Sequence, residues 1–166
     1  MRIGISTSVI QRGKTGIARY VLSLARGLLA HEAGHQFVLF VLEEDMPLFD
    51  FAKGGAEIVR VPEKYRTAIA DIRWHQGTLP GLARELKLDV LHVPSYRRML
   101  WRRPCAMVAT IHDLAAFQVA KKYDWARMFY GRVVVKYLAR RQDAIIAVSQ
   151  STADDIAARF GLSAGR

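Results

Sequence analysis

The sequence predicts an α/β fold with an open, mostly parallel sheet and helices on both faces. Short runs rich in β-branched and aromatic residues alternate with longer segments whose apolar residues recur at helical spacing. Several short runs are apolar at nearly every position, as expected of parallel strands that helices cover on both sides. Glycines and polar residues follow these runs, and the ligand crevice of such a sheet lies beyond the carboxyl ends of its strands.

Six segments are predicted to be strands because they are short, apolar and β-branched: residues 3–6, 37–42, 56–61, 90–93, 106–111 and 144–148. Helical spacing predicts helices at residues 17–30, 72–86 and 125–140. A last helix is expected to begin near Ser151, with Asp154 placed to complete a capping box. The order β-α-β-β-α-β-β-α-β-α predicts one Rossmann-like domain over residues 1–166, without an internal boundary.

The composition indicates an acidic partner. The formal net charge is +10 and the pI is near 10.2, which suits phosphorylated ligands, anionic lipid or nucleic acid. No apolar run approaches the roughly 20 residues that span a bilayer, and no signal peptide is visible, so we expect a cytoplasmic protein. Four arginines flank an aromatic residue, a pattern typical of peripheral contact with an anionic inner membrane face, although a solvated surface remains the alternative. These five residues are Arg97, Arg98, Trp101, Arg102 and Arg103.

The turn after the first predicted strand contains Gly13, Lys14, Thr15 and Gly16. Free N–H groups and the dipole of the following helix favour a phosphate or a hydroxyl-rich ligand there. A P-loop is excluded because Ser8 stands where that motif requires its first glycine. A plain turn between strand and helix is the alternative interpretation.

His112 and Asp113 directly follow the predicted strand 106–111. The imidazole can bond a sugar hydroxyl or a phosphate, and the carboxylate can fix the histidine tautomer or cap the next turn. A loop histidine without a ligand remains the alternative. Residues 31–35 read HEAGH, but Gly34 is expected to break the helix that a zinc site would need, so we predict no metal site. Cys105 is expected to be a small buried residue.

Six strings occur in a fixed order along the chain: GIARY at 16–20, GHQFV at 34–38, LP at 79–80, DVLHVP at 89–94, TIHDL at 110–114 and DAIIAVSQS at 143–151. Together they resemble the amino-terminal half of the retaining glycosyltransferases of family 4, which have the GT-B fold. The resemblance covers nearly the whole chain. It departs from the family at residues 11–14 (QRGK), where relatives often have a richer run of glycines.

The resemblance implies a hexosyltransferase-type reaction, in which a sugar passes from a nucleotide-sugar to an acceptor hydroxyl of a glycan, glycolipid or small molecule. It implies catalytic roles for His112 and Asp113 and contact of the donor phosphates with the turn Gly13–Gly16, without a metal or other cofactor. It places the acceptor against Tyr96, Arg97, Arg98 and Ser149. The donor-binding carboxyl-terminal half is expected to be absent from these 166 residues, so the chain alone is expected to be inactive.

Two other classes remain open. A nucleotide-binding part of an oxidoreductase would need G-x-G-x-x-G after the first strand, which is missing, although Glu43 and Glu44 supply an acid after the second. A basic nucleic-acid-binding module would need aromatic residues on an exposed sheet face, whereas these strands look buried on both sides. We therefore expect no nucleic-acid partner.

Overall fold

A computed structural model describes residues 1–31, 34–114 and 130–162. Six strands form one sheet in the order β3-β2-β1-β4-β5-β6, and every neighbouring pair is parallel. The strands are β1 (Arg2–Ser6), β2 (Gln36–Leu42), β3 (Ala56–Val61), β4 (Val90–Val93), β5 (Ala106–Ile111) and β6 (Ala144–Ala147). The predicted Rossmann-like α/β fold is confirmed.

The helices are α1 (Gly16–Ala30), α2 (Ala68–Arg73), α3 (Leu79–Glu85), α5 (Lys136–Arg140) and α6 (Gln150–Phe160). A π-helical turn, Trp74–Thr78, joins α2 to α3, so the helix expected at 72–86 begins four residues earlier, at Ala68. Another π-helical turn, Tyr130–Val135, leads into α5, and residues 125–129 of that predicted helix lie outside the described residues. Short 3-10 helices follow several strands: η1 (Ser8–Gly13), η2 (Glu43–Ala52), η3 (Glu63–Tyr65) and η5 (Tyr96–Arg98).

The start of α6 differs from the expected capping box. Ser149, in extended conformation, is the N-cap, and its Oγ accepts a hydrogen bond from the Thr152 N–H at 3.2 Å. Asp154 instead accepts from the side-chain amide of Gln150 at 2.9 Å. The prediction was wrong because Ser149 lies where the strand conformation ends, and a serine there reaches the first free N–H groups before Ser151 can.

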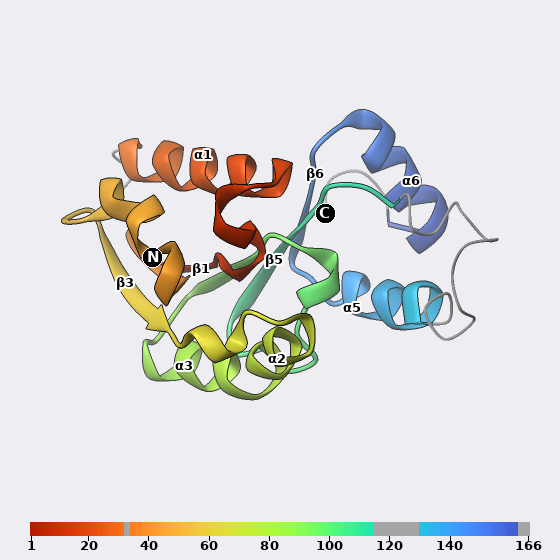
Figure 1. Cartoon of the computed structure of the whole chain (residues 1–166). Helices are drawn as coiled ribbons and strands as arrows, with labels where there is room; N and C mark the ends of the chain where they lie inside the picture. Colours follow the sequence, from red (N-terminus) through yellow and green to blue (C-terminus); the bar gives the residue numbers. More distant parts are fainter. Residues whose placement is uncertain (32–33, 115–129, 163–166) are drawn as a thin grey trace.

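The helices form a layer on each face of the sheet (Figure 1). α1 and η2 pack on one face against Ile5, Leu39 and Val41. The π-helical turn and α3 cover the other face, where Trp74 and Leu79 meet Phe40 and Leu91. All residues of β2 from Phe37 to Leu42 are buried, which explains why this strand is apolar on both sides.

The chain reverses its direction of travel across the sheet between β3 and β4. β1, β2 and β3 succeed each other toward one edge, whereas β4, β5 and β6 succeed each other toward the other. The switch point therefore lies between β1 and β4, and ligands of open α/β sheets bind beyond the carboxyl ends of the strands at that point. We call this side of the molecule the carboxyl edge.

Candidate functional site

The structure brings His112 and Tyr20, one turn into α1, together at the carboxyl edge. His112 directly follows β5, and its ring lies edge-on to the ring of Tyr20, with the centroids 4.9 Å apart and the planes at 87°. Tyr20 is four residues beyond Gly16, the first residue of α1. Since a helix rises about 1.5 Å per residue, Gly16 lies about one turn from this contact.

Burial lowers the pKa of His112, while a hydrogen bond to the Pro94 carbonyl and the charge of Asp113 act in the opposite direction without cancelling it. The imidazole is therefore neutral at pH 7. Its Nε2 is covered and has no hydrogen-bond partner within the described part of the chain. A ring that donates to Pro94 through its other nitrogen presents Nε2 as an acceptor. A ligand hydroxyl could reach this acceptor after a small movement of the side chains that cover it.

A chain of hydroxyl contacts holds Tyr20 beneath this histidine. The Tyr20 hydroxyl lies 3.0 Å from Thr110 Oγ1, which lies 2.8 Å from His92 Nε2. Burial, with a smaller contribution from His112, lowers the pKa of His92 to about 4, so this core histidine is uncharged. The sequence alone did not predict the contacts among Tyr20, Thr110 and His92. A polar threonine and a histidine inside two otherwise apolar strands could have indicated them.

The predicted phosphate-binding turn lies between β1 and α1. Thr15 is the N-cap of α1, and its Oγ1 accepts from the Ala18 N–H at 3.1 Å. Lys14 is exposed. The N–H groups of Gly16 and Ile17 have no partner among the described residues, so they remain available to an anion at the positive end of the helix dipole. Gln11, Arg12 and Gly13 have positive φ, so the turn enters the helix through left-handed backbone.

The four residues predicted to contact an acceptor lie around the same edge, and each of them has a structural partner. Arg97 lies over the ring of Tyr96, and its Nε donates to the Tyr96 hydroxyl at 3.1 Å. Arg98 Nε donates to Asp71 Oδ2 at 2.5 Å. The Ser149 hydroxyl caps α6, and the neighbouring Thr152 hydroxyl donates to the main-chain carbonyl of His112 at 3.2 Å. The start of α6 is thereby fixed beside His112.

A buried network continues inward from Arg98. Asp71 accepts from Arg98, its main-chain oxygen lies 2.8 Å from His75 Nδ1, and His75 Nε2 lies 2.9 Å from Ser6 Oγ. Burial tends to raise the pKa of Asp71, but hydrogen bonds and charges from His75 and Arg98 outweigh it, and the pKa lies below its usual value. The arrangement is similar to a Ser-His-Asp triad, yet Ser6 is only 1% exposed. It therefore ties the end of β1 to α2 and η5, and it does not present a nucleophile.

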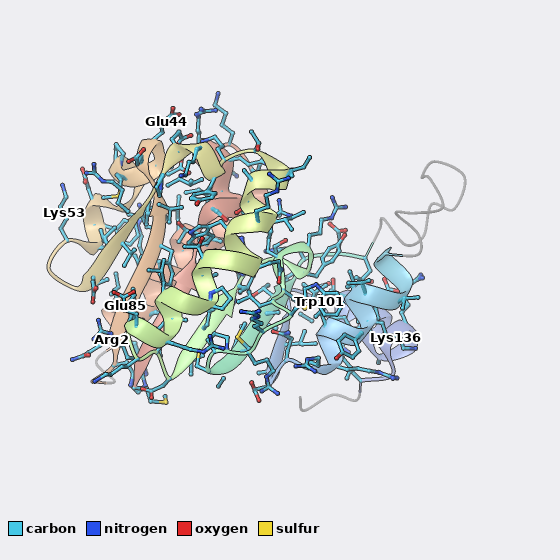
Figure 2. The ribbon with its side chains drawn as sticks, turned by 90° about the horizontal axis from the view of Figure 1, so that it is seen from below. Arg2, Glu44, Lys53, Glu85, Trp101 and Lys136 are labelled. Atoms are coloured by element: carbon cyan, nitrogen blue, oxygen red, sulfur yellow. The ribbon has the colours of Figure 1, made fainter. Side chains whose placement is uncertain are left out.

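The arginines grouped with Trp101 in the sequence do not form one surface. Arg98 binds Asp71 near the carboxyl edge, whereas Arg103 binds both oxygens of Asp143 beside the beginnings of β5 and β6. Trp101 is 48% exposed and its ring packs against Tyr137 of α5, with the centroids 5.6 Å apart. Figure 2 shows Trp101 close to α5 and far from Glu44. We call the exposed residues Trp101, Arg102 and Tyr137, together with the half-buried Arg141, the Trp101 patch.

Other features that stand out in the sequence do not add to this site. α1 ends at Ala30 and Gly34 has a φ of 65°, so His31 and His35 do not share a helical face as a zinc motif would require. Burial raises the pKa of Cys105 to about 11, which makes its thiol unreactive. A hollow of about 440 Å³ lies at the opposite edge of the sheet, beside Arg2 and Glu57.

The strand order and the contact of Tyr20 with His112 at the carboxyl edge define an open α/β domain with a ligand-binding edge at its topological switch point. The model of the family described as Glycosyltransferase Family 4 matches residues 14–166, and the chain belongs to this family. A search of curated proteins found no match. No helix among the described residues is both long and apolar enough to cross a bilayer.

Proposed function

We propose that this domain is the acceptor-side half of a GT-B enzyme that transfers a sugar from a nucleotide-sugar to an acceptor hydroxyl, with retention at the anomeric carbon. The observation that carries the proposal is the contact between Tyr20 and His112, which places a neutral imidazole beside the start of α1. A sugar held at the histidine and a phosphate at the helix start would then be adjacent. Membership of glycosyltransferase family 4 supports glycosyl transfer in general.

In the proposed reaction, the acceptor oxygen bonds to the anomeric carbon on the face from which the phosphate leaves. The bond between that carbon and the phosphate oxygen breaks, and the acceptor proton passes to the departing phosphate. His112 binds a hydroxyl of the donor sugar and Asp113 orients the imidazole. The N–H groups of the turn Gly13–Gly16 stabilise the charge that develops on the phosphate. Tyr96 and Arg97 border the acceptor, and no metal or other cofactor is assigned.

The proposal includes a second domain that grips the nucleotide, so residues 1–166 alone neither transfer nor hydrolyse a sugar at a measurable rate. The direct test is a titration of the enzyme that contains this domain with a panel of nucleotide-sugars, beside a nucleic-acid shift assay at matched salt. Nucleotide-sugar binding without a shift is expected. Salt-dependent nucleic-acid binding without nucleotide-sugar binding would replace the proposal with a basic nucleic-acid module.

Gly16→Val is expected to weaken nucleotide-sugar use by tenfold or more while the domain stays folded. A Cβ at position 16 would meet no heavy atom of the described residues within 4 Å, so the protein itself has room for the side chain. A phosphate bound at the N–H groups of this turn would leave no room for that side chain. Transfer kinetics of the enzyme that contains this domain, with the melting temperature as a control, measure the effect. Gly27→Val in the last turn of α1, also in open space, is the matched variant, and equal losses in both would contradict close ligand approach at Gly16.

We further propose that the Trp101 patch contacts anionic lipid at the inner membrane face, which would suit a lipid-linked acceptor. The exposed Trp101 and Tyr137 rings can lie at the headgroup level, and Arg141 beside Tyr137 adds charge. Because Arg98 and Arg103 are already paired with carboxylates, Arg102 is the better residue to test.

Arg102→Gln is expected to lower partitioning onto vesicles rich in phosphatidylserine about fivefold, since a basic residue near such a surface contributes about 1 kcal/mol. Trp101→Ala should weaken it further. Co-sedimentation at low and high salt measures both, and Arg60→Gln, an exposed arginine on β3, is the control. Binding that is absent, insensitive to salt, or equally reduced by the control would favour a soluble acceptor.

A further inference from the structure

Two polar side chains lie in line with His112 on one face of the sheet. His92 of β4 lies opposite Val108 of β5 in the register of this parallel pair. Successive side chains of a strand alternate between the two faces of the sheet. Thr110 and His112 follow Val108 at intervals of two, so they lie on the same face. Ile5, which is paired with His92 and packs against α1, shows that this is the face that α1 covers.

The hydroxyl contacts on this face end at Tyr20. Thr110 is fully buried and His92 is 5% exposed, and Thr110 Oγ1 lies 2.8 Å from His92 Nε2. The Tyr20 hydroxyl comes from α1 and lies 3.0 Å from the same Thr110 oxygen. Apolar residues would fill the two strand positions without any polar group to satisfy, so the effect of a threonine and a histidine here is directional. They hold the tip of the Tyr20 ring at one point beside β5.

The ring of Tyr20 limits how the side chain of His112 can turn. Rotation about the last side-chain bond of a histidine has no sharp preference, so an imidazole needs a neighbour to fix where its nitrogens point. The main chain of His112 is held by Thr152, whose hydroxyl donates to its carbonyl at 3.2 Å. The imidazole itself meets the Tyr20 ring edge-on, with the centroids 4.9 Å apart. This contact fixes the direction of Nε2, which is buried and has no partner within the described residues.

We propose that Tyr20, anchored through its hydroxyl to Thr110 and His92, is a positioning residue that fixes the direction of the His112 imidazole. Tyr20 acts through His112, since its own hydroxyl is directed inward at Thr110. That the oriented Nε2 receives a hydroxyl of the donor sugar rests on the proposed function. That Tyr20 orients the ring does not, because it follows from the contacts of Tyr20 with Thr110 and His112.

The first test is NMR of the histidine rings in the chain labelled with isotopic histidine. The signal that is lost in His112→Ala identifies the ring of His112 among the five histidines. Tyr20→Leu is expected to shift this signal and to raise the pKa of His112 toward its ordinary value, because water would reach a ring whose pKa burial lowers. Tyr65→Leu changes another half-buried tyrosine, which packs on the opposite face of the sheet, and this matched control should leave the signal unchanged.

The second test separates positioning from support of the fold. In the enzyme that contains this domain, Tyr20→Leu is expected to lower kcat/KM about tenfold, because a misplaced binding group slows the reaction. The same change in the His112→Ala background should have little further effect, because a residue that acts through His112 then has no side chain to position. A purely structural role would give the same loss in both backgrounds.

An unchanged His112 signal in Tyr20→Leu would overturn the proposal, and so would an equal change in Tyr65→Leu or an equal rate loss in both backgrounds. If Tyr20→Leu does not fold, Tyr20→Phe decides the question, because it keeps the ring and removes only the hydroxyl that Thr110 anchors. A shifted His112 signal in that variant would support the inference, and an unchanged one would reject it. Absence of sugar transfer by the enzyme would instead overturn the proposed function and leave the NMR result standing.

Discussion

Replacing His112 with alanine is expected to reduce kcat/KM of the enzyme that contains this domain by about a hundredfold or more, or about 2.7 kcal/mol of transition-state stabilisation. The variant removes the neutral imidazole whose Nε2 has no partner within the described residues. Its main-chain carbonyl, which accepts from Thr152, remains in place. The fold should therefore survive, apart from the lost ring contact with Tyr20.

Steady-state kinetics with the preferred nucleotide-sugar measure this effect, and thermal unfolding shows whether the variant is intact. His35→Ala is the matched control, because His35 lies just before β2 at the opposite edge of the sheet. An unaltered rate in His112→Ala, or an equal loss in His35→Ala, would return His112 to the role of a loop histidine without a ligand.

Replacing Asp71 with alanine is expected to lower the free energy of unfolding by about 3–5 kcal/mol, the usual cost of removing one partner from a buried ion pair. The variant leaves the guanidinium of Arg98, whose side chain is 14% exposed, without its carboxylate. It also removes the carboxylate oxygen that lies 3.1 Å from His75 Nδ1, while the main-chain oxygen of residue 71, at 2.8 Å from the same nitrogen, remains. Urea unfolding at pH 7 measures the loss.

The same carboxylate gives a pH dependence of known sign. The folded state lowers the pKa of Asp71. Its contribution to the free energy of unfolding is therefore fully present above the unfolded pKa near 3.9 and is lost as the pH falls through the folded pKa. The difference in stability between the parent and Asp71→Ala should therefore shrink at strongly acidic pH. Asp50→Ala, which breaks an exposed pair with Lys53, should cost less than about 1 kcal/mol at any pH. A loss equally small for Asp71→Ala would contradict a buried network.

The sequence by itself determined the fold class, the six strands to within a residue or two, and the placement of polar residues after them. These features are local, because strand and helix periodicity, and the residues that end a strand, depend only on residues that are neighbours in the chain. The histidine after β5 and the glycine turn before α1 were found in this way. The helix starts were less accurate, as Ser149 and Ala68 show, because capping depends on where the preceding backbone turns.

Only the tertiary structure decided which of these residues meet. Tyr20 contacts His112, Asp71 binds Arg98, and Glu44 binds Arg12, although each pair is separated by at least 27 residues in the chain. Arg98 and Arg103, only five residues apart in the sequence, instead bind Asp71 and Asp143 near opposite edges of the sheet. The physical reason is that the strand order β3-β2-β1-β4-β5-β6, fixed by packing of the helices on both faces, sets which strand ends are neighbours.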